Sequence, residues 1–292
     1  MNVQEEVRDL LRRGFVTTAF QPIVQLNTGR VVGYESLLRG PAGSPLANPG
    51  YIFGPTSPLS SSLIMDLDAA CIAAALRAGR LLVPFGQLFI NLHISTLVHM
   101  RQMQDHFQKL MESSGIPPEA VVIEISERST TSTPRALSRV LRTLRKMGYQ
   151  FALDDFGTAY SGLQHLLWFE PEFIKVDRAF CMGIHRSARK QALMASIASL
   201  SKKLGSDVIV EGVESTPELL TLMALDIPMA QGFHFGKPQG ALFWTAETEL
   251  NSVYKQWFRS SVDLEDQPAP PRIASPDKAV VPMPNPQSGA GS

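Results

Sequence analysis

The chain has 292 residues, of which 44% are hydrophobic and 18% charged, and its 27 basic and 27 acidic side chains give a formal net charge of zero. This composition supports a large globular core, and the balanced charge argues against a DNA-binding protein with a broad basic face. No stretch of the sequence approaches the roughly 20 uninterrupted apolar residues that a membrane span needs. The two cysteines, Cys71 and Cys181, are far apart and fit reduced thiols. We therefore expect a cytoplasmic location, with neither DNA nor a membrane as a partner.

Composition divides the chain into three parts. Residues 1–14 predict a short amphipathic helix that ends at Gly14. Residues 15–259 form the body of the protein. Residues 260–292 are rich in proline and contain no aromatic residue, which predicts a disordered tail. A second proline-rich stretch, 41–58, lies inside the body and is interpreted as a long surface loop.

The body alternates short apolar runs with amphipathic segments. The apolar runs predict strands at 15–25, 31–38, 88–93, 121–126, 150–155, 173–177, 207–212 and 229–233. The amphipathic segments predict helices at 66–79, 97–115, 134–148, 187–205 and 216–226. This alternation indicates an α/β protein with a parallel sheet. A single domain of this length favours a barrel of the TIM (β/α)8 type over an open doubly wound sheet, which remains the alternative.

Polar residues stand at the ends of most of the predicted strands. They are Glu35, Asn91, Glu124, Asp154 with Asp155, Lys175, Glu211 and Gln231. The carboxyl ends of barrel strands converge on one mouth, where the chemistry of such proteins takes place. A turn acid or an outward-facing charge would explain any one of these residues as well. Their recurrence on strand after strand indicates a shared site.

Several carboxylates around one mouth cannot all ionise unless a cation compensates them. Carboxylate and amide oxygens favour Mg²⁺ or Mn²⁺ over zinc. The adjacent Asp154 and Asp155 could hold two ions about 3.5–4 Å apart, an arrangement suited to displacement at phosphorus. Lys175 could position a water or a phosphate oxygen, or form a structural ion pair with a barrel acid, and Arg39 is well placed to bind phosphate. The residues thus predict metal-assisted hydrolysis of a phosphodiester and leave the substrate open.

The residues YESLLR at 34–39 resemble the signature of the EAL domain, a family of bacterial phosphodiesterases that hydrolyse cyclic di-GMP. Further segments resemble the motifs of that family in their order, namely FQPIV (20–24), INLHIST (90–96), IEISER (123–128), ALDDFGTAYSGL (152–163), FIKVDRAF (173–180), VIVEGVES (208–215) and MAQGFHFGKP (229–238). The resemblance implies a modified TIM barrel with one antiparallel strand, homodimerisation, and two Mg²⁺ or Mn²⁺ ions per active site. It also implies a linear product, 5′-pGpG.

The resemblance assigns roles by motif. For the metals it implies Glu35, Asn91, Glu124 and Asp154 around one ion and Asp154, Asp155 and Glu211 around the other. For catalysis it implies Glu35, Lys175 beside the nucleophilic water, and Glu211 as a candidate general base. For the substrate it implies Leu37, Arg39, Asp155 and Gln231. It further implies that Glu127 anchors the loop after Asp155 and that Glu214 contacts metal ligands without binding the metal itself.

The sequence departs from the family at a few positions and leaves other functions open. Ser36 stands where the family has alanine, Ala159 and Gly162 replace common loop residues, and 50–62 departs most. A receptor that binds cyclic di-GMP without hydrolysis and acts through protein partners is one alternative, although the metal ligand set is complete here. A glycosidase with two carboxylates on the same fold is another, but it gives no role to Lys175. Because no sensor segment is recognisable, the regulatory input is left open between a regulatory protein partner, the expression level and oligomerisation.

Overall fold

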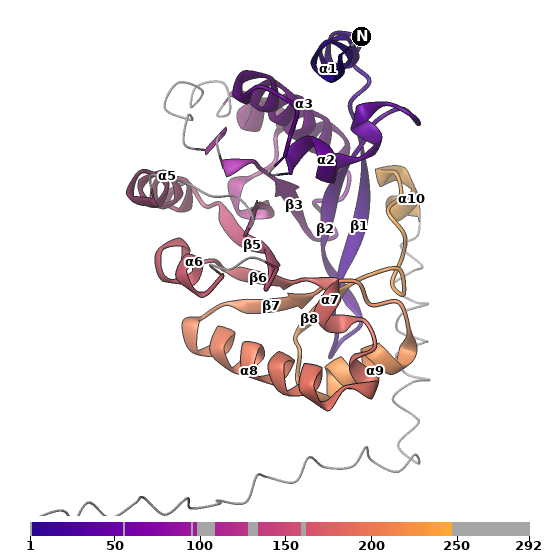
Figure 1. Ribbon diagram of the computed structural model, residues 1–292, viewed down its shortest axis with the longest axis vertical. Helices are drawn as coiled ribbons and strands as arrows, with labels where there is room; N and C mark the ends of the chain where they lie inside the picture. The colour runs from indigo at the N-terminus through magenta and orange to yellow at the C-terminus, as the bar shows by residue number, and fades with distance from the viewer. Residues whose placement is uncertain are drawn as a thin grey trace, which may run out of the picture.

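The computed structural model describes residues 2–54, 56–94, 96–97, 109–127, 134–158 and 162–246. Eight strands follow one another around a closed barrel in chain order (Figure 1). The first strand pairs antiparallel with both of its neighbours, whereas every other neighbouring pair is parallel. The prediction of a single-domain barrel of the TIM type with one antiparallel strand is confirmed.

All eight predicted strands are present. They are β1 (Thr17–Gln25), β2 (Arg30–Arg39), β3 (Gln87–Asn91), β4 (Val121–Ser126), β5 (Gln150–Phe156), β6 (Phe173–Val176), β7 (Asp207–Val210) and β8 (Met229–Gln231). The α-helices given for the described residues are α1 (Val3–Arg12), α2 (Pro49–Phe53), α3 (Ser61–Gly79), α5 (Pro134–Lys146), α6 (Gly162–Phe169), α7 (Arg178–Cys181), α8 (Ala188–Leu204), α9 (Thr216–Ala224) and α10 (Ala241–Ala246). Most of the helix predicted at 97–115 falls outside the described residues.

The inside of the barrel contains one apolar layer. It is made of Ile23, Phe89, Val122, Ala152, Phe173, Ile209 and Met229. The rings of Phe89 and Phe173 meet edge to face across it, with centroids 5.4 Å apart. Opposite faces of the same strands pack against the surrounding helices in a larger apolar cluster, and in Figure 1 α8 and α9 lie along the outside of β7 and β8. The inner layer therefore closes the barrel below its mouth.

The prediction of a surface loop at 41–58 is wrong for 45–47 and 49–53, which are helical, whereas the other described residues of the segment have no regular structure and lie wholly or partly at the surface. This segment forms a 3₁₀ turn, η1 (Pro45–Ala47), followed by α2, and each begins with a proline in its first turn. Proline is well suited to that position because the first-turn N–H groups have no intrahelical partner. Leu46 and Ile52 are fully buried against α1 and α3. The prolines thus start short helices that bury apolar side chains beside the barrel mouth.

The N-terminal segment folds as a helix, α1, with Val7 and Leu10 buried. The proposed tail, 260–292, lies outside the described residues, as does the end of the body from 247 onward. Among the helices that the structure describes, none has the length and apolar character to cross a membrane.

Candidate active site

The polar ring at the barrel mouth follows from the two-residue period of the strands. Successive side chains on a strand point to opposite faces, so residues two apart share a face. On β3 to β8, the polar side chain lies two residues after the inner-layer residue of the same strand, giving Asn91, Glu124, Asp154, Lys175, Glu211 and Gln231. On β2, Glu35 follows Gly33 in the same way, and a side chain at position 33 would collide with the Phe89 ring. The structure thus places one predicted polar residue from each of β2 to β8 one layer above the apolar core.

Lys175 lies at the centre of this ring. Its side chain is 0% exposed, and its Nζ is 2.8 Å from Glu211 Oε1, 2.9 Å from Glu124 Oε1, 3.1 Å from Glu35 Oε2 and 3.2 Å from Asp154 Oδ1. Burial alone would lower the pKa of Lys175, but the surrounding carboxylates raise it well above its ordinary value. The lysine is therefore charged at neutral pH. Its contacts agree with the prediction that it forms structural ion pairs with acids of the barrel.

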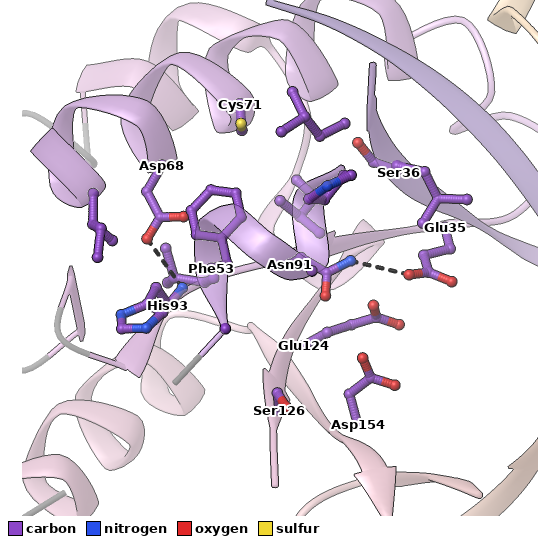
Figure 2. Close-up of a pocket in the computed structure, with 18 of the residues that line it drawn as sticks. Glu35, Ser36, Phe53, Asp68, Cys71, Asn91, His93, Glu124, Ser126 and Asp154 are labelled. Atoms are coloured by element: carbon purple, nitrogen blue, oxygen red, sulfur yellow. Dashed lines mark hydrogen bonds between the residues drawn. The ribbon is translucent and has the colours of Figure 1, made fainter. Parts of the chain in front are cut away.

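Glu35 is held by donors on both carboxylate oxygens. Asn91 Nδ2 donates to Oε1 at 3.0 Å, and Gln231 Nε2 donates to Oε2 at 2.7 Å. Burial opposes ionisation of Glu35, but the Lys175 ammonium and the two amide donors outweigh it and lower the pKa of Glu35. Glu35 is consequently an anion with a fixed orientation (Figure 2).

Glu124, Asp154 and Glu211 resist ionisation. Burial, with the charges of Glu35 and Asp154, raises the pKa of Glu124 well above its usual range. Burial likewise raises the pKa of Asp154, and it raises that of Glu211 to about 8, in both cases against the effect of Lys175. One ammonium does not neutralise five neighbouring carboxyl groups, counting Asp155. Either protons or additional cations must compensate the remainder.

The donor set fits a hard divalent cation. One carboxylate oxygen from each of Asp154, Asp155 and Glu211 lies within 4.8 Å of the other two. The buried Glu124 Oε2 has no hydrogen-bond partner among the described residues, so it is an oxygen lone pair available to an ion. Figure 2 shows the carboxylates of Glu35, Glu124 and Asp154 pointing toward one another. Oxygen donors of this kind suit Mg²⁺ or Mn²⁺.

Asp155 lies inside β5 in an unusual conformation, where the pairing of β5 with β6 is irregular. Its φ is +58°, in the left-handed region that residues other than glycine seldom adopt. Ser126 Oγ donates to Asp155 Oδ2 at 3.0 Å from the neighbouring strand β4. This irregularity in the strand allows two successive aspartates to face the same mouth, whereas a regular strand would direct them to opposite faces.

Of the two supporting glutamates, Glu127 is the one that contacts the loop after Asp155 among the residues that the structure describes. Its Oε2 accepts from Gly157 N at 2.7 Å and from Thr158 N at 3.2 Å, which is the contact expected of a loop anchor. Glu214 is exposed, and its backbone N–H donates to Glu218 Oε2 at 3.2 Å. The structure brings Glu127 to the loop and leaves the Glu214 side chain at the surface.

A cavity of about 680 Å³ opens beside the ring. Its wall includes Glu35, Asn91, Glu124, Asp154 and Asp155, as well as the predicted substrate residues Leu37 and Arg39. The divergent segment also contributes, with Gly50, Phe53, Gly54, Ser57 and Leu59, and Pro49 just before it lines the wall too. The segment in which this sequence departs most from the family is therefore a wall of the same cavity.

The sequence interpretation missed polar residues that support the site. Asp68 of α3 lines the far side of the cavity and accepts hydrogen bonds from His93 N, at 3.0 Å, and from Thr96 Oγ1 (Figure 2). Burial raises the pKa of Asp68 to about 7. Gln21 of β1 is buried within the ring itself. The sequence did contain an indication for Gln21. It lies two residues before Ile23, and because β1 runs antiparallel to its neighbours, this is the position that corresponds to two residues after the inner layer on β2.

The metal-free protein should respond to pH through Glu211. Its folded pKa of about 8 lies above the unfolded value of about 4.3, so the folded state keeps a proton that the unfolded state has lost. The contribution of Glu211 to stability is then full below about pH 4.3 and is lost as the pH rises through about 8. Glu211→Gln mimics the protonated acid. In EDTA its melting temperature should equal that of the wild type near pH 4.5 and exceed it increasingly toward pH 8.

Thermal unfolding of both proteins across this pH range measures the difference. A saturating concentration of Mn²⁺ should reverse it near pH 8, because the ligand must lose its proton to bind an ion. A difference in melting temperature that stays constant with pH in EDTA would contradict the raised pKa of Glu211.

Comparison with known proteins identifies the family. The family model described as EAL domain matches residues 4–238. The cyclic di-GMP phosphodiesterase RocR of Pseudomonas aeruginosa is 32% identical over 238 residues, which cover 80% of this chain and 60% of RocR. The probable cyclic di-GMP phosphodiesterase PdeG of Escherichia coli is 28% identical over 243 residues, covering 80% of this chain and 47% of PdeG. The chain thus spans less than two thirds of the length of these curated relatives.

Solved structures agree with this result. A manganese and cyclic di-GMP complex of Klebsiella pneumoniae BlrP1 superposes with a TM-score of 0.67 and 33% identity, covering 78% of this chain and 57% of BlrP1. A standalone EAL protein of Vibrio cholerae O395 in its c-di-GMP-bound form gives a TM-score of 0.68 and 29% identity, covering 77% of this chain and 93% of that protein. The ordered motifs, the closed barrel with its antiparallel first strand, and the match over residues 4–238 show that this chain belongs to the EAL domain family.

Proposed function

We propose that this protein is a metal-dependent phosphodiesterase that hydrolyses cyclic di-GMP to linear 5′-pGpG. The observation that carries the proposal is the complete ring of oxygen donors around Lys175, with more carboxyl groups than one ammonium neutralises. The names of the relatives support the substrate, since RocR and PdeG are described as cyclic di-GMP phosphodiesterases. The manganese and cyclic di-GMP complex of BlrP1 supports a divalent cofactor.

Two Mg²⁺ or Mn²⁺ ions are proposed for each active site. Glu35, Asn91, Glu124 and Asp154 would hold one ion, and Asp154, Asp155 and Glu211 would hold the other. Such a pair, when bound, would generate a hydroxide nucleophile near neutral pH and stabilise both the attacking and the leaving oxygen.

The residues of the chain have separate tasks around the reacting phosphate. Lys175, a charged donor fixed by four ion pairs, can orient the attacking water or stabilise a phosphate oxygen. The resemblance to the family makes Glu211 the candidate general base, and its carboxylate lies within 4.8 Å of those of Asp154 and Asp155, beside the proposed ions. Gln231 keeps Glu35 in position through its hydrogen bond.

The cavity matches a cyclic dinucleotide in size and composition. Its volume of about 680 Å³ falls within the range of about 300–1,000 Å³ that is typical of small-molecule sites. Leu37 offers apolar contact and Arg39 offers a guanidinium that can bind a phosphodiester. A substrate with negatively charged phosphates is repelled by a ring of carboxylates until cations are present. We therefore expect substrate binding as well as turnover to depend on the metal.

Incubation of the purified protein with cyclic di-GMP tests the proposal. We expect 5′-pGpG to form with Mg²⁺ or Mn²⁺ and no product in EDTA, as measured by chromatography of the nucleotides. Metal-dependent binding without turnover would instead support the receptor, which is the second candidate function. Hydrolysis that continues unchanged in EDTA would contradict the metal-dependent mechanism.

A homodimer is part of the proposal. Helix α6 exposes Leu163 to 64% and Leu167 to 80%, one turn apart on the same face, and adjoining exposed leucines are a candidate contact surface. The mass of the particle in light scattering decides between dimer and monomer. A regulatory protein partner remains proposed from the sequence alone.

A further inference from the structure

The antiparallel strand β1 brings a second glutamine into the polar ring. Gln21 lies two residues before Ile23 of the inner apolar layer. Because β1 runs antiparallel to β2, the position two residues before Ile23 is level with the position two residues after Gly33. Gln21 is paired directly opposite Glu35 in the β1–β2 register and is 8% exposed. It is therefore a buried polar side chain in the ring to which the proposed reaction gives no task.

Hydrogen bonds connect Gln21 to the ligand Glu35 through Gln231. Gln21 Nε2 donates to the Gly236 carbonyl at 3.0 Å, and Gln21 Oε1 accepts from Gln231 Nε2 at 3.1 Å. The same Gln231 nitrogen donates to Glu35 Oε2 at 2.7 Å. The network thus runs from the backbone after β8, through two side-chain amides, to a proposed metal ligand.

The direction of this network is determined at both ends. The Gly236 carbonyl and the ionised Glu35 can only accept hydrogen bonds, so an amide nitrogen must face each of them. With its nitrogen toward Gly236, Gln21 presents its oxygen to Gln231. Gln231 then uses both N–H groups of its nitrogen, one toward Gln21 and one toward Glu35. A single hydrogen bond would leave the Gln231 amide free to rotate, whereas these two hydrogen bonds hold its plane.

Loss of Gln21 would change how Glu35 is held. Gln231 is 3% exposed, so in the absence of Gln21 one of its N–H groups would be buried without an acceptor and the amide would turn to seek one. Asn91 fixes only the other oxygen of the Glu35 carboxylate. We propose that Gln21 is a positioning residue of the metal centre, which holds the Gln231 amide so that Glu35 faces the ion in one orientation. This inference rests on the proposed function, because it assumes that Glu35 is a metal ligand.

A double-mutant cycle on Mn²⁺ affinity tests the inference. The metal-free protein is titrated with Mn²⁺ and followed by electron paramagnetic resonance, without substrate, for the wild type, Gln21→Met, Gln231→Met and the double variant. We expect Gln21→Met to bind Mn²⁺ about 10-fold more weakly, as is common when a group that orients a ligand is lost. In the Gln231→Met background the same change should cost less than about twofold, because Gln21 acts through Gln231.

The control is Gln25→Met, the same chemical change on the same strand. Gln25 lies at the other end of β1, where its Oε1 accepts from Thr28 Oγ1 at 2.8 Å, and we expect wild-type Mn²⁺ affinity. If Gln21→Met does not fold, Gln21→Asn withdraws the amide by one methylene and should show the same loss. Wild-type affinity in either folded variant, or losses that add in the double variant, would overturn the inference.

The cycle separates this inference from the proposed function. A wild-type protein that binds Mn²⁺ but does not cleave cyclic di-GMP would refute the phosphodiesterase, and the Mn²⁺ titrations would still decide the role of Gln21. A wild-type protein that binds no Mn²⁺ would refute both.

Discussion

Replacement of Glu35 by alanine should abolish the hydrolysis of cyclic di-GMP. We expect turnover to fall by at least about 10³-fold, equivalent to roughly 4 kcal/mol of lost transition-state stabilisation. The variant loses an ionised oxygen ligand and also leaves three donors, on Lys175, Asn91 and Gln231, without their acceptor. The measurement is the rate of 5′-pGpG formation at saturating Mn²⁺.

Glu6→Ala on α1 is the matched control, because it removes the same side chain from a helix outside the barrel, and we expect it to keep wild-type turnover. Circular dichroism must show that both variants are folded. A folded Glu35→Ala protein that retains more than about a tenth of the activity would show that Glu35 is not an essential ligand.

Replacement of Lys175 by methionine should abolish turnover and also destabilise the metal-free protein. Four carboxylates lie around Lys175 Nζ, and removal of one partner from a buried ion pair costs about 3–5 kcal/mol at neutral pH. The loss should shrink toward pH 5, because the acids then take up protons, and it should shrink at pH 7 when Mn²⁺ supplies the missing positive charge.

Urea unfolding in EDTA and in Mn²⁺ measures these free energies of unfolding. Lys203→Met, at an exposed position in the last turn of α8, is the control and should change stability by less than about 1 kcal/mol. A Lys175→Met protein as stable as the wild type in EDTA at pH 7 would show that the ring does not need the ammonium.

The positions of the strands and of most site residues could be predicted from the sequence. An apolar run that ends in a polar residue is a local pattern, and the two-residue period of a strand links Phe89 to Asn91 and Ile209 to Glu211 without knowledge of any partner strand. The helices at 187–205 and 216–226 were predictable for a similar reason, since glycine or capping residues mark their ends. Patterns of this kind depend on neighbours along the chain.

The segment 41–58 shows where such patterns fail. Its prolines and glycines predict a loop locally, yet Leu46 and Ile52 are buried because α1 and α3 provide an apolar surface for them. The role of Asp68 could not be predicted either, because its hydrogen-bond partners, His93 and Thr96, come from a different part of the chain. Tertiary contacts outweighed the local preference in both cases.

The sequence by itself determined which strands form, which of their side chains are acidic, and that these would gather at the carboxyl ends of the strands, because strand periodicity and residue chemistry are local properties. Only the tertiary structure decided that Lys175 contacts four separate acids and that Gln21 joins Gln231 and Glu35. The physical reason is closure: β1 pairs with both β2 and β8, and the register of strands some 200 residues apart in the chain is set by packing across the whole barrel.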